Sequence, residues 1–116
     1  MDKAIKKGTC QYRLIAGKDA MEVLQGKWRI PIIISLTDGD KRFGEIQREI
    51  GNISPKMLSQ ELKALEENKI ISRTLYDRMP ITVEYSLTPL GRSTDKLLDE
   101  FLKWGTHFRN EMLENR

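Results

Sequence analysis

The feature that most constrains the fold is a three-residue interruption, Gly51-Asn52-Ile53, between two segments with helical periodicity. The segment before it carries apolar side chains on one helical face, namely Phe43, Ile46 and Ile50. The segment after it starts with Ser54-Pro55, which pairs a capping hydroxyl with a proline suited to the first helical position. We therefore predict two helices, over residues 43–50 and 54–67, joined by a short turn.

The second of these helices is expected to have two different faces. Its apolar positions fall on one side and form a stripe that a core would bury, consisting of Leu58, Leu62 and Leu65. The other side is polar, and no Asp or Glu occurs between Ser54 and Gln60. The side chains expected on this polar face are those of Lys56, Ser59, Gln60 and Lys63.

Two segments rich in strand-forming residues, 70–76 and 82–87, come next. The second alternates Val83, Tyr85 and Leu87 with polar residues, which predicts a strand with one buried face. Residues 77–80 between the two segments form a turn that projects the basic side chain of Arg78. The pattern predicts a β-hairpin.

The rest of the chain is predicted to be mainly helical. A short helix capped by Asp19 fits residues 19–25, and another fits residues 29–36, although its isoleucines would also suit a buried strand. Thr88-Pro89 repeats the cap-plus-proline signal and opens a helix expected from residue 90 to about 114. Residues 1–18 show no clear periodicity, so we interpret them as an N-terminal basic arm and residues 19–116 as one domain.

Charge and composition exclude several classes of protein. The net charge is only +3, and the excess lies in the arm, where five Lys and Arg residues face one acid. The longest apolar run, residues 30–34, is far short of the roughly 20 residues that a membrane helix needs. A single cysteine and the lack of a visible secretory signal fit a cytoplasmic protein. Because no metal-ligand spacing and no glycine-rich phosphate loop occurs, we predict no enzyme, no metal and no cofactor.

The order of the expected elements is that of a winged helix-turn-helix. We predict an α+β, mainly helical fold with a two-stranded wing and a long C-terminal dimerisation helix. An α-helix fits the major groove of DNA, and its N-terminal residues reach the base edges first. Gln60 could pair with adenine and Lys56 with guanine or phosphate, while Arg78 would meet the minor groove or the backbone.

The predicted C-terminal helix carries more apolar side chains than one small domain needs. Leu97, Phe101, Trp104 and Phe108 lie near one stripe. Burial against a second copy of the chain is one explanation, and packing across the chain's own N-terminal helix is the other.

Four stretches resemble the HxlR family of small bacterial transcription regulators, which is related in fold to the MarR group. They read GKW at 26–28, RFGEI at 42–46, ISPKMLSQEL at 53–62 and VEYSLTPLG at 83–91. The resemblance runs from about residue 10 to residue 105. It implies a homodimer in the bacterial cytoplasm that binds a roughly palindromic operator, with the helix after Gly51-Asn52-Ile53 as its recognition helix.

The resemblance also assigns DNA contacts by position. In the recognition helix these are Ser54, Pro55, Lys56, Ser59, Gln60 and Lys63. Arg42 takes the place of a DNA-backbone contact, and Arg78 lies in the wing. The wing departs from the family pattern, because Pro80-Ile81-Thr82 stands where Pro-Pro-Arg is common, so one wing cation is missing.

Cys10 is the last candidate site. Several members of the family sense oxidants, quinones or aldehydes through a cysteine at this place, although Cys-Pro is common there and this chain has Cys10-Gln11. Lys6, Lys7 and Arg13 are close in sequence, and positive charge favours the reactive thiolate. Cys10 is thus either a sensor of oxidants or electrophiles or an inert thiol. Two rival functions stay open: a winged-helix adaptor that binds protein instead of DNA, and a thiol enzyme built on Cys10.

Overall fold

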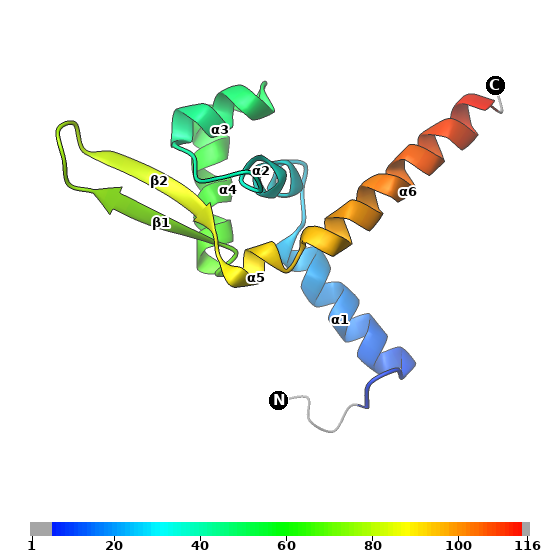
Figure 1. The fold of residues 1–116 in the computed structure, drawn as a ribbon. Helices are drawn as coiled ribbons and strands as arrows, with labels where there is room; N and C mark the ends of the chain where they lie inside the picture. Colours follow the sequence, from blue (N-terminus) through cyan, green and yellow to red (C-terminus); the bar gives the residue numbers. More distant parts are fainter. Residues whose placement is uncertain (1–5, 115–116) are drawn as a thin grey trace.

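A computed structural model describes residues 6–114 of the chain as six helices and one β-hairpin (Figure 1). In chain order the elements are α1 (Cys10–Val23), α2 (Arg29–Ser35), α3 (Phe43–Ile50), α4 (Pro55–Glu67), β1 (Ile71–Tyr76), β2 (Thr82–Leu87), α5 (Pro89–Arg92) and α6 (Asp95–Glu114). Helices α2, α3 and α4 and the hairpin form one body, from which α1 and α6 extend in different directions. The predicted winged helix-turn-helix order is confirmed.

The hydrophobic core lies where α2, α3, α4 and the base of the hairpin meet. The predicted stripe of α4 is buried in it, with Leu58, Leu62 and Leu65 almost inaccessible to solvent. The isoleucine-rich segment is a helix, as we predicted over the alternative of a buried strand. The other members of the core are Ile32, Ile33, Leu36, Ile46, Ile53, Ile70, Ile71, Leu87 and Leu98.

Helix α4 begins where the Ser-Pro signal predicts. The Ser54 hydroxyl accepts a hydrogen bond from the Met57 amide at 3.1 Å, and Pro55 occupies the first turn. Helix α3 ends at Gly51, whose φ of 73° lies in the left-handed region that favours glycine. The Gln47 side chain then donates to the Ile53 carbonyl at 3.1 Å and closes the turn between the two helices. The sequence therefore fixes both ends of this helix-turn-helix locally.

Strands β1 and β2 pair antiparallel, from Ile71 opposite Leu87 to Tyr76 opposite Thr82. Lys41, between α2 and α3, adds a single bridge to β2: its N–H donates to the Tyr85 carbonyl at 3.0 Å, and its carbonyl accepts from the Tyr85 N–H at 2.8 Å. The predicted alternation of β2 is only partly right. Leu87 is buried while Val83 and Tyr85 are only partly buried, because only the base of this hairpin reaches the core. Thr82, on the opposite face at the turn end, is buried as well.

Helix α1 begins much earlier than predicted. It starts at Cys10 and not at Asp19, and Thr9 caps it by accepting a hydrogen bond from the Tyr12 amide at 3.1 Å. Our expectation that no helix precedes residue 19 is wrong for a physical reason. No residue of α1 is buried, so the helix has no core-facing stripe for a sequence pattern to show.

The C-terminal segment forms two helices where one was predicted. Thr88 caps α5 by accepting from the Gly91 amide at 3.0 Å, but this helix lasts only one turn. The Thr94 hydroxyl donates to the Gly91 carbonyl at 2.7 Å, and Ser93 bonds back into the same turn. Hydroxyl groups that donate to carbonyls of the preceding turn compete with the backbone hydrogen bonds that would continue the helix. The chain therefore bends before α6, and Leu98 is the one residue of α6 that is buried.

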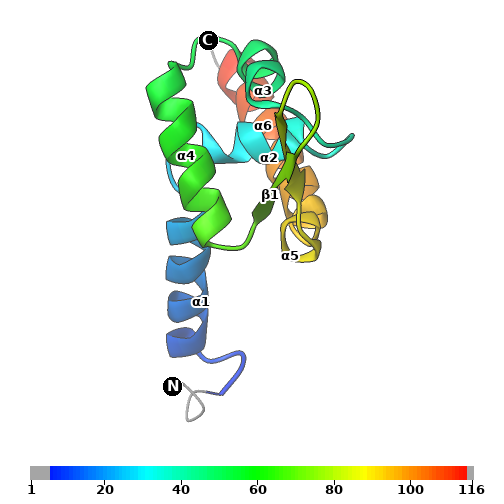
Figure 2. The same cartoon turned by 90° about the vertical axis from the view of Figure 1, so that its left-hand side faces the viewer.

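The chain is more extended than a compact domain of its length. Its radius of gyration is 17.1 Å, whereas about 13.4 Å is expected for a compact chain of this length. Its accessible surface is 8992 Å², against roughly 6,500 Å² for a monomeric protein of this mass. Figure 1 shows why: α1 and α6 both project from the body, and Figure 2 shows the projection of α1 again.

Candidate nucleic-acid interface

One face of α4 is polar and exposed, and it lies beside the hairpin (Figure 2). The structure places on this face the four residues that the sequence predicted there, Lys56, Ser59, Gln60 and Lys63, opposite the buried leucines. Ser54 and Pro55 stand at its N-terminal end and are also exposed. The start of a helix favours an anion, because its first amides and its dipole both carry positive partial charge.

The hairpin extends this face with two residues that the sequence pattern did not indicate. Ser59, Lys63 and Glu66 of α4 share a recess of about 330 Å³ with Arg73 and Tyr85 of the hairpin. Arg73 is paired across the hairpin with Tyr85, and its Nε lies 3.8 Å from Glu66 Oε1. Burial raises the pKa of the Tyr85 phenol. The only sequence signal was a cation among strand-forming residues, which does not reveal its distance from α4.

Arg42 stands at the start of α3 and is exposed. Its backbone amide donates to the Glu45 carboxylate at 2.8 Å, which caps the helix and leaves the guanidinium outside this bond. The preceding residue, Lys41, is the one bridged to Tyr85. The structure therefore holds Arg42 next to the hairpin that adjoins α4.

Lys41 itself is a structural cation. Its ammonium donates to the Asp38 carboxylate at 2.6 Å, to the Glu49 carboxylate at 3.1 Å and to the Ser35 carbonyl. The hydrogen bond with Asp38 is the main reason why the pKa of Lys41 is raised, and the same bond lowers the pKa of Asp38. These bonds tie the end of α2 to α3 and keep the bridging segment against the hairpin.

Arg78 lies in the hairpin turn, as predicted, but its guanidinium already has neighbours. It stacks over the Tyr76 ring, 4.7 Å from the centroid, and one of its nitrogens is 3.8 Å from the Glu84 carboxylate. The tip also carries the exposed acid Asp77 and two apolar side chains, Met79 and Ile81, which are 96% and 61% exposed. The tip of the wing thus presents one partly compensated cation between an acid and apolar side chains.

The four residues predicted at a dimer interface are exposed in the single chain. Leu97, Phe101, Trp104 and Phe108 are each between 50% and 63% exposed, and the rings of Trp104 and Phe108 stack at 5.4 Å. The stripe continues into a groove of about 510 Å³ between the end of α1 and the start of α6. Because α1 and α6 diverge beyond this groove (Figure 1), packing across the chain's own N-terminal helix does not cover the stripe.

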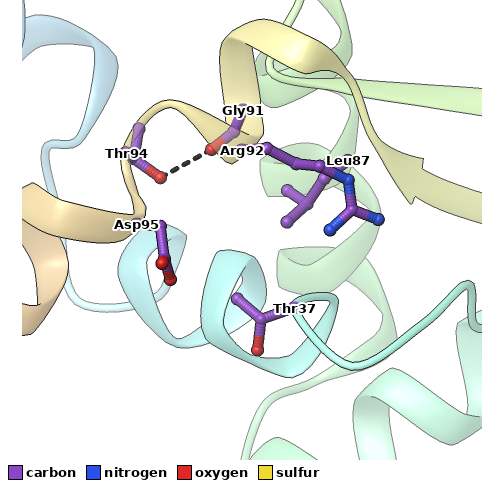
Figure 3. Close-up of a pocket in the computed structure, with 6 residues that line it drawn as sticks. All are labelled: Thr37, Leu87, Gly91, Arg92, Thr94 and Asp95. Carbon is purple, nitrogen blue, oxygen red and sulfur yellow. Dashed lines mark hydrogen bonds between the residues drawn. The ribbon is translucent and has the colours of Figure 1, made fainter.

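Two further places lie away from the α4 face. Cys10 is an exposed free thiol at the first residue of α1, and the structure does not bring it to α4. A recess of about 250 Å³ occupies the bend between α5 and α6 (Figure 3). Its lining consists of Thr37, Leu87, Gly91, Arg92, Thr94 and Asp95, none of which the sequence marked as a site.

Two classes of site find no support within residues 6–114. None of the helices in this part of the chain is long and apolar enough to cross a membrane. The same residues contain no group of three or more His, Cys, Asp and Glu side chains that could hold a metal ion.

A helix-turn-helix whose second helix exposes a cationic face beside a β-hairpin defines the winged helix-turn-helix class of DNA-binding regulators. The comparison with known families agrees. The family model described as HxlR-like helix-turn-helix matches residues 23–113, and the chain belongs to this family.

Individual relatives support the same conclusion. The chain is 40% identical over 98 residues to the uncharacterized HTH-type transcriptional regulator YtcD of Bacillus subtilis (strain 168), covering 84% of this chain and 78% of the relative. Among solved structures, the redox regulator HypR in its reduced form matches with a TM-score of 0.79 and 34% identity, covering 87% of this chain and 99% of that one. The reduced form of the transcriptional regulator YodB from B. subtilis matches with a TM-score of 0.73 and 38% identity, covering 78% and 90%. The protein is a DNA-binding transcription regulator of the helix-turn-helix type.

Proposed function

We propose that this protein acts as a homodimer on a pseudo-palindromic operator, with one α4 in the major groove of each half-site. The observation that carries the proposal is the exposed polar face of α4, which has no carboxylate before Glu61 and lies beside the hairpin. A helix of this kind fits the major groove, and a wing next to it reaches the flanking DNA.

The proposed contacts fall into base readers and phosphate contacts. Gln60 has the amide that pairs bidentately with adenine, and Lys56 reaches guanine or a phosphate oxygen. The remaining surface positions the helix on the backbone. Its members are Ser54, Pro55, Ser59 and Lys63 of the helix region, Arg42 before α3, and Arg73 and Arg78 of the hairpin.

The surface area of the single chain supports the homodimer. The chain exposes about 2,500 Å² more than a compact monomer of its mass, and a stable interface needs only about 800 Å² from each partner. The exposed surface includes the apolar stripe of α6, with Phe101 and Trp104 more than half exposed. A second copy of the chain that packs α6 against α6 and enters the groove beside α1 would cover this stripe and would relate two copies of α4 by a two-fold axis.

A selection from random duplex DNA with the purified full-length protein tests the proposal directly. The expected product is an inverted repeat, and sedimentation of the complex should give two chains per duplex. A selected motif without two-fold symmetry, or no motif at all, would overturn the operator assignment. A free protein that sediments as a monomer at micromolar concentration would overturn the dimer.

Variants assign the contacts on the selected duplex. Lys56→Ala and Gln60→Ala should each weaken binding, and Gln60→Ala should lose discrimination at one base pair, worth about 1–3 kcal/mol. Lys103→Ala is the matched control, because Lys103 is an exposed lysine on α6, outside the proposed surface. Wild-type affinity for both α4 variants in a gel-shift titration would remove these residues from the interface.

The second part of the proposal is that Cys10 makes DNA binding responsive to oxidants or electrophiles. The thiol is free and exposed on α1, which borders the proposed interface, and HypR is named a redox regulator. With one cysteine per chain, diamide would oxidise two Cys10 thiols to an intersubunit disulfide, taking up their two electrons and two protons. With a quinone, the Cys10 thiolate would instead add to a ring carbon, and the adduct would take up a proton, so that no group leaves.

The thiol is tested by comparing Cys10→Ser with wild type in the same gel-shift assay. Wild-type affinity should change on treatment with diamide or a quinone, and addition of a thiol reductant should reverse the diamide effect. The Cys10→Ser protein should bind DNA and ignore both reagents. A Cys10→Ser protein that still responds would exclude the cysteine from sensing.

A further inference from the structure

Arg29, the first residue of α2, joins three helices through one guanidinium group. Its Nε lies 3.1 Å from Glu61 Oε1 on α4. One of its terminal nitrogens donates to the carbonyls of Glu22 and Val23 at 3.0 and 3.1 Å, at the end of α1. The side chains of Arg29 and Glu61 are only 12% and 18% exposed, so this contact is largely shielded from water.

The chemistry of the group explains why one residue makes both contacts. The last carbonyls of a helix have no partner within the helix and carry the negative end of its dipole, which favours a cation. A guanidinium presents donors along several directions in one rigid plane, whereas a lysine ammonium is a single point charge. Arg29 therefore satisfies the end of α1 with one edge and binds the α4 carboxylate with another.

Side-chain packing does little to connect the same two helices. A groove of about 470 Å³ separates the end of α1 from α4, and residues of both helices line it together with Arg29, among them Glu22, Val23, Ala64 and Glu67. Glu61 directly follows Gln60, the proposed base reader, and its own side chain turns to the body and not to the exposed face. Besides the packing of Val23 and Leu24 against the edge of the core, the Arg29 guanidinium is thus the link between the end of α1 and α4.

We propose that Arg29 is a positioning residue that fixes the orientation of the recognition helix relative to α1, and so sets the spacing of half-sites that the dimer accepts. The inference rests on the proposed dimer, in which α1 borders the subunit interface. In that dimer, a displacement of α1, including one caused by modification of Cys10, would shift α4 through the Arg29 guanidinium. In the proposed complex Arg29 does not contact DNA.

The test measures the affinity of the full-length protein for the selected inverted repeat and for repeats with one base pair added or removed between the half-sites. Wild type should prefer the selected spacing. Arg29→Gln and Glu61→Gln should each lower the affinity at that spacing by about tenfold and reduce the difference in affinity between spacings. The affinity of the double variant should be no lower than that of either single variant, because the two residues act through one contact. Arg29→Lys keeps the positive charge but not the planar geometry of the guanidinium, so its affinity and spacing preference should lie between those of wild type and Arg29→Gln. This variant keeps the test available if Arg29→Gln folds poorly.

Electrostatics alone predicts a different result. Glu61→Gln removes a negative charge near the DNA, so without a positioning role its affinity should rise at every spacing. Asp99→Asn provides the matched control, because Asp99 pairs with Lys103 within α6 and connects no two helices. Variants that keep the wild-type spacing preference, or that lose affinity equally at all spacings, would overturn the inference while leaving the proposed function intact. A wild-type protein without any spacing preference would instead overturn the dimeric operator complex itself, and the inference with it.

Discussion

Replacing Gly91 by alanine should destabilise the protein, although the change adds a single methyl group. Gly91 lies in α5, buried against the loop before β1. A Cβ built at this position would lie 2.1 Å from the Ile70 carbonyl oxygen and 3.1 Å from a Leu87 methyl group. Carbon and carbonyl oxygen ordinarily approach no closer than roughly 3.3 Å, so the two backbones would have to separate by about 1 Å.

The Ile70 carbonyl cannot move away at low cost. It accepts hydrogen bonds from both the N–H and the hydroxyl of Thr88, each at 3.0 Å. Overpacking of this kind costs about 1–3 kcal/mol, and losing one of the two bonds costs about 1 kcal/mol more. Alanine regains about 1 kcal/mol through its better helix propensity. We expect a net loss of about 1–3 kcal/mol in the free energy of unfolding.

Urea unfolding followed by tryptophan fluorescence, at one fixed protein concentration, measures this loss. Gly17→Ala in α1 is the matched control, because nothing lies within 4 Å of a Cβ at that position. The control should be stabilised by about 0.5–1 kcal/mol, since it gains helix propensity without a clash. A Gly91→Ala protein within about 0.5 kcal/mol of wild type would refute the steric reasoning, because such a value is typical of a surface substitution.

Three further predictions concern Lys41 in the body, the charge of the wing, and the apolar side chain of Trp104 on α6. The folded state raises the pKa of Lys41 above its ordinary value of 10.5. The contribution of Lys41 to stability should therefore be complete below pH 10.5 and disappear as the pH rises through the higher pKa of the folded state. The difference in unfolding free energy between wild type and Lys41→Gln, measured against pH, should shrink only above pH 10.5. Ile81→Arg adds an exposed cation to the wing, next to Thr82, where the family pattern has its arginine. The slope of log affinity against log salt should then steepen by about 2 for a dimer, and an unchanged slope would mean that the wing tip does not reach phosphate. Trp104→Ala should weaken dimerisation at least tenfold by sedimentation, since burying on the order of 100 Å² of this side chain at about 25 cal/mol/Å² gives about 2.5 kcal/mol.

The sequence predicted those elements whose signals are local. Ser54-Pro55 marked the start of α4, and its leucine stripe defined which face is buried, so the exposed side of α4 follows from the order of residues alone. Both strands of the hairpin were predicted to within one residue of their observed ends. Each of these signals is contained within one or two turns of chain, which is why they hold without knowledge of the tertiary fold.

The parts that could not be predicted depend on contacts between distant residues. Helix α1 was missed up to Asp19 because it buries nothing within the single chain. Arg73 joins the α4 face through strand pairing with Tyr85, and no sequence pattern gives that distance. Arg29 and Glu61 are separated by 32 positions, and each alone resembles an ordinary surface charge. Tertiary geometry gives these residues their role.

The net charge of +3 does not show which charges of the α4 and hairpin surface are paired within the protein. On the α4 and hairpin surface, Arg73 and Arg78 each lie 3.8 Å from a carboxylate of the same chain, those of Glu66 and Glu84, and both arginines are about half exposed. A phosphate that approaches either arginine must compete with this carboxylate, so part of the attraction to DNA is already compensated within the protein. Within residues 6–114, no carboxylate forms an ion pair with Lys56 or Lys63 on the exposed face of α4. In the proposed complex, the attraction for phosphate would therefore be concentrated on α4, where it would also orient the helix that reads the bases, and the wing would contribute a weaker share.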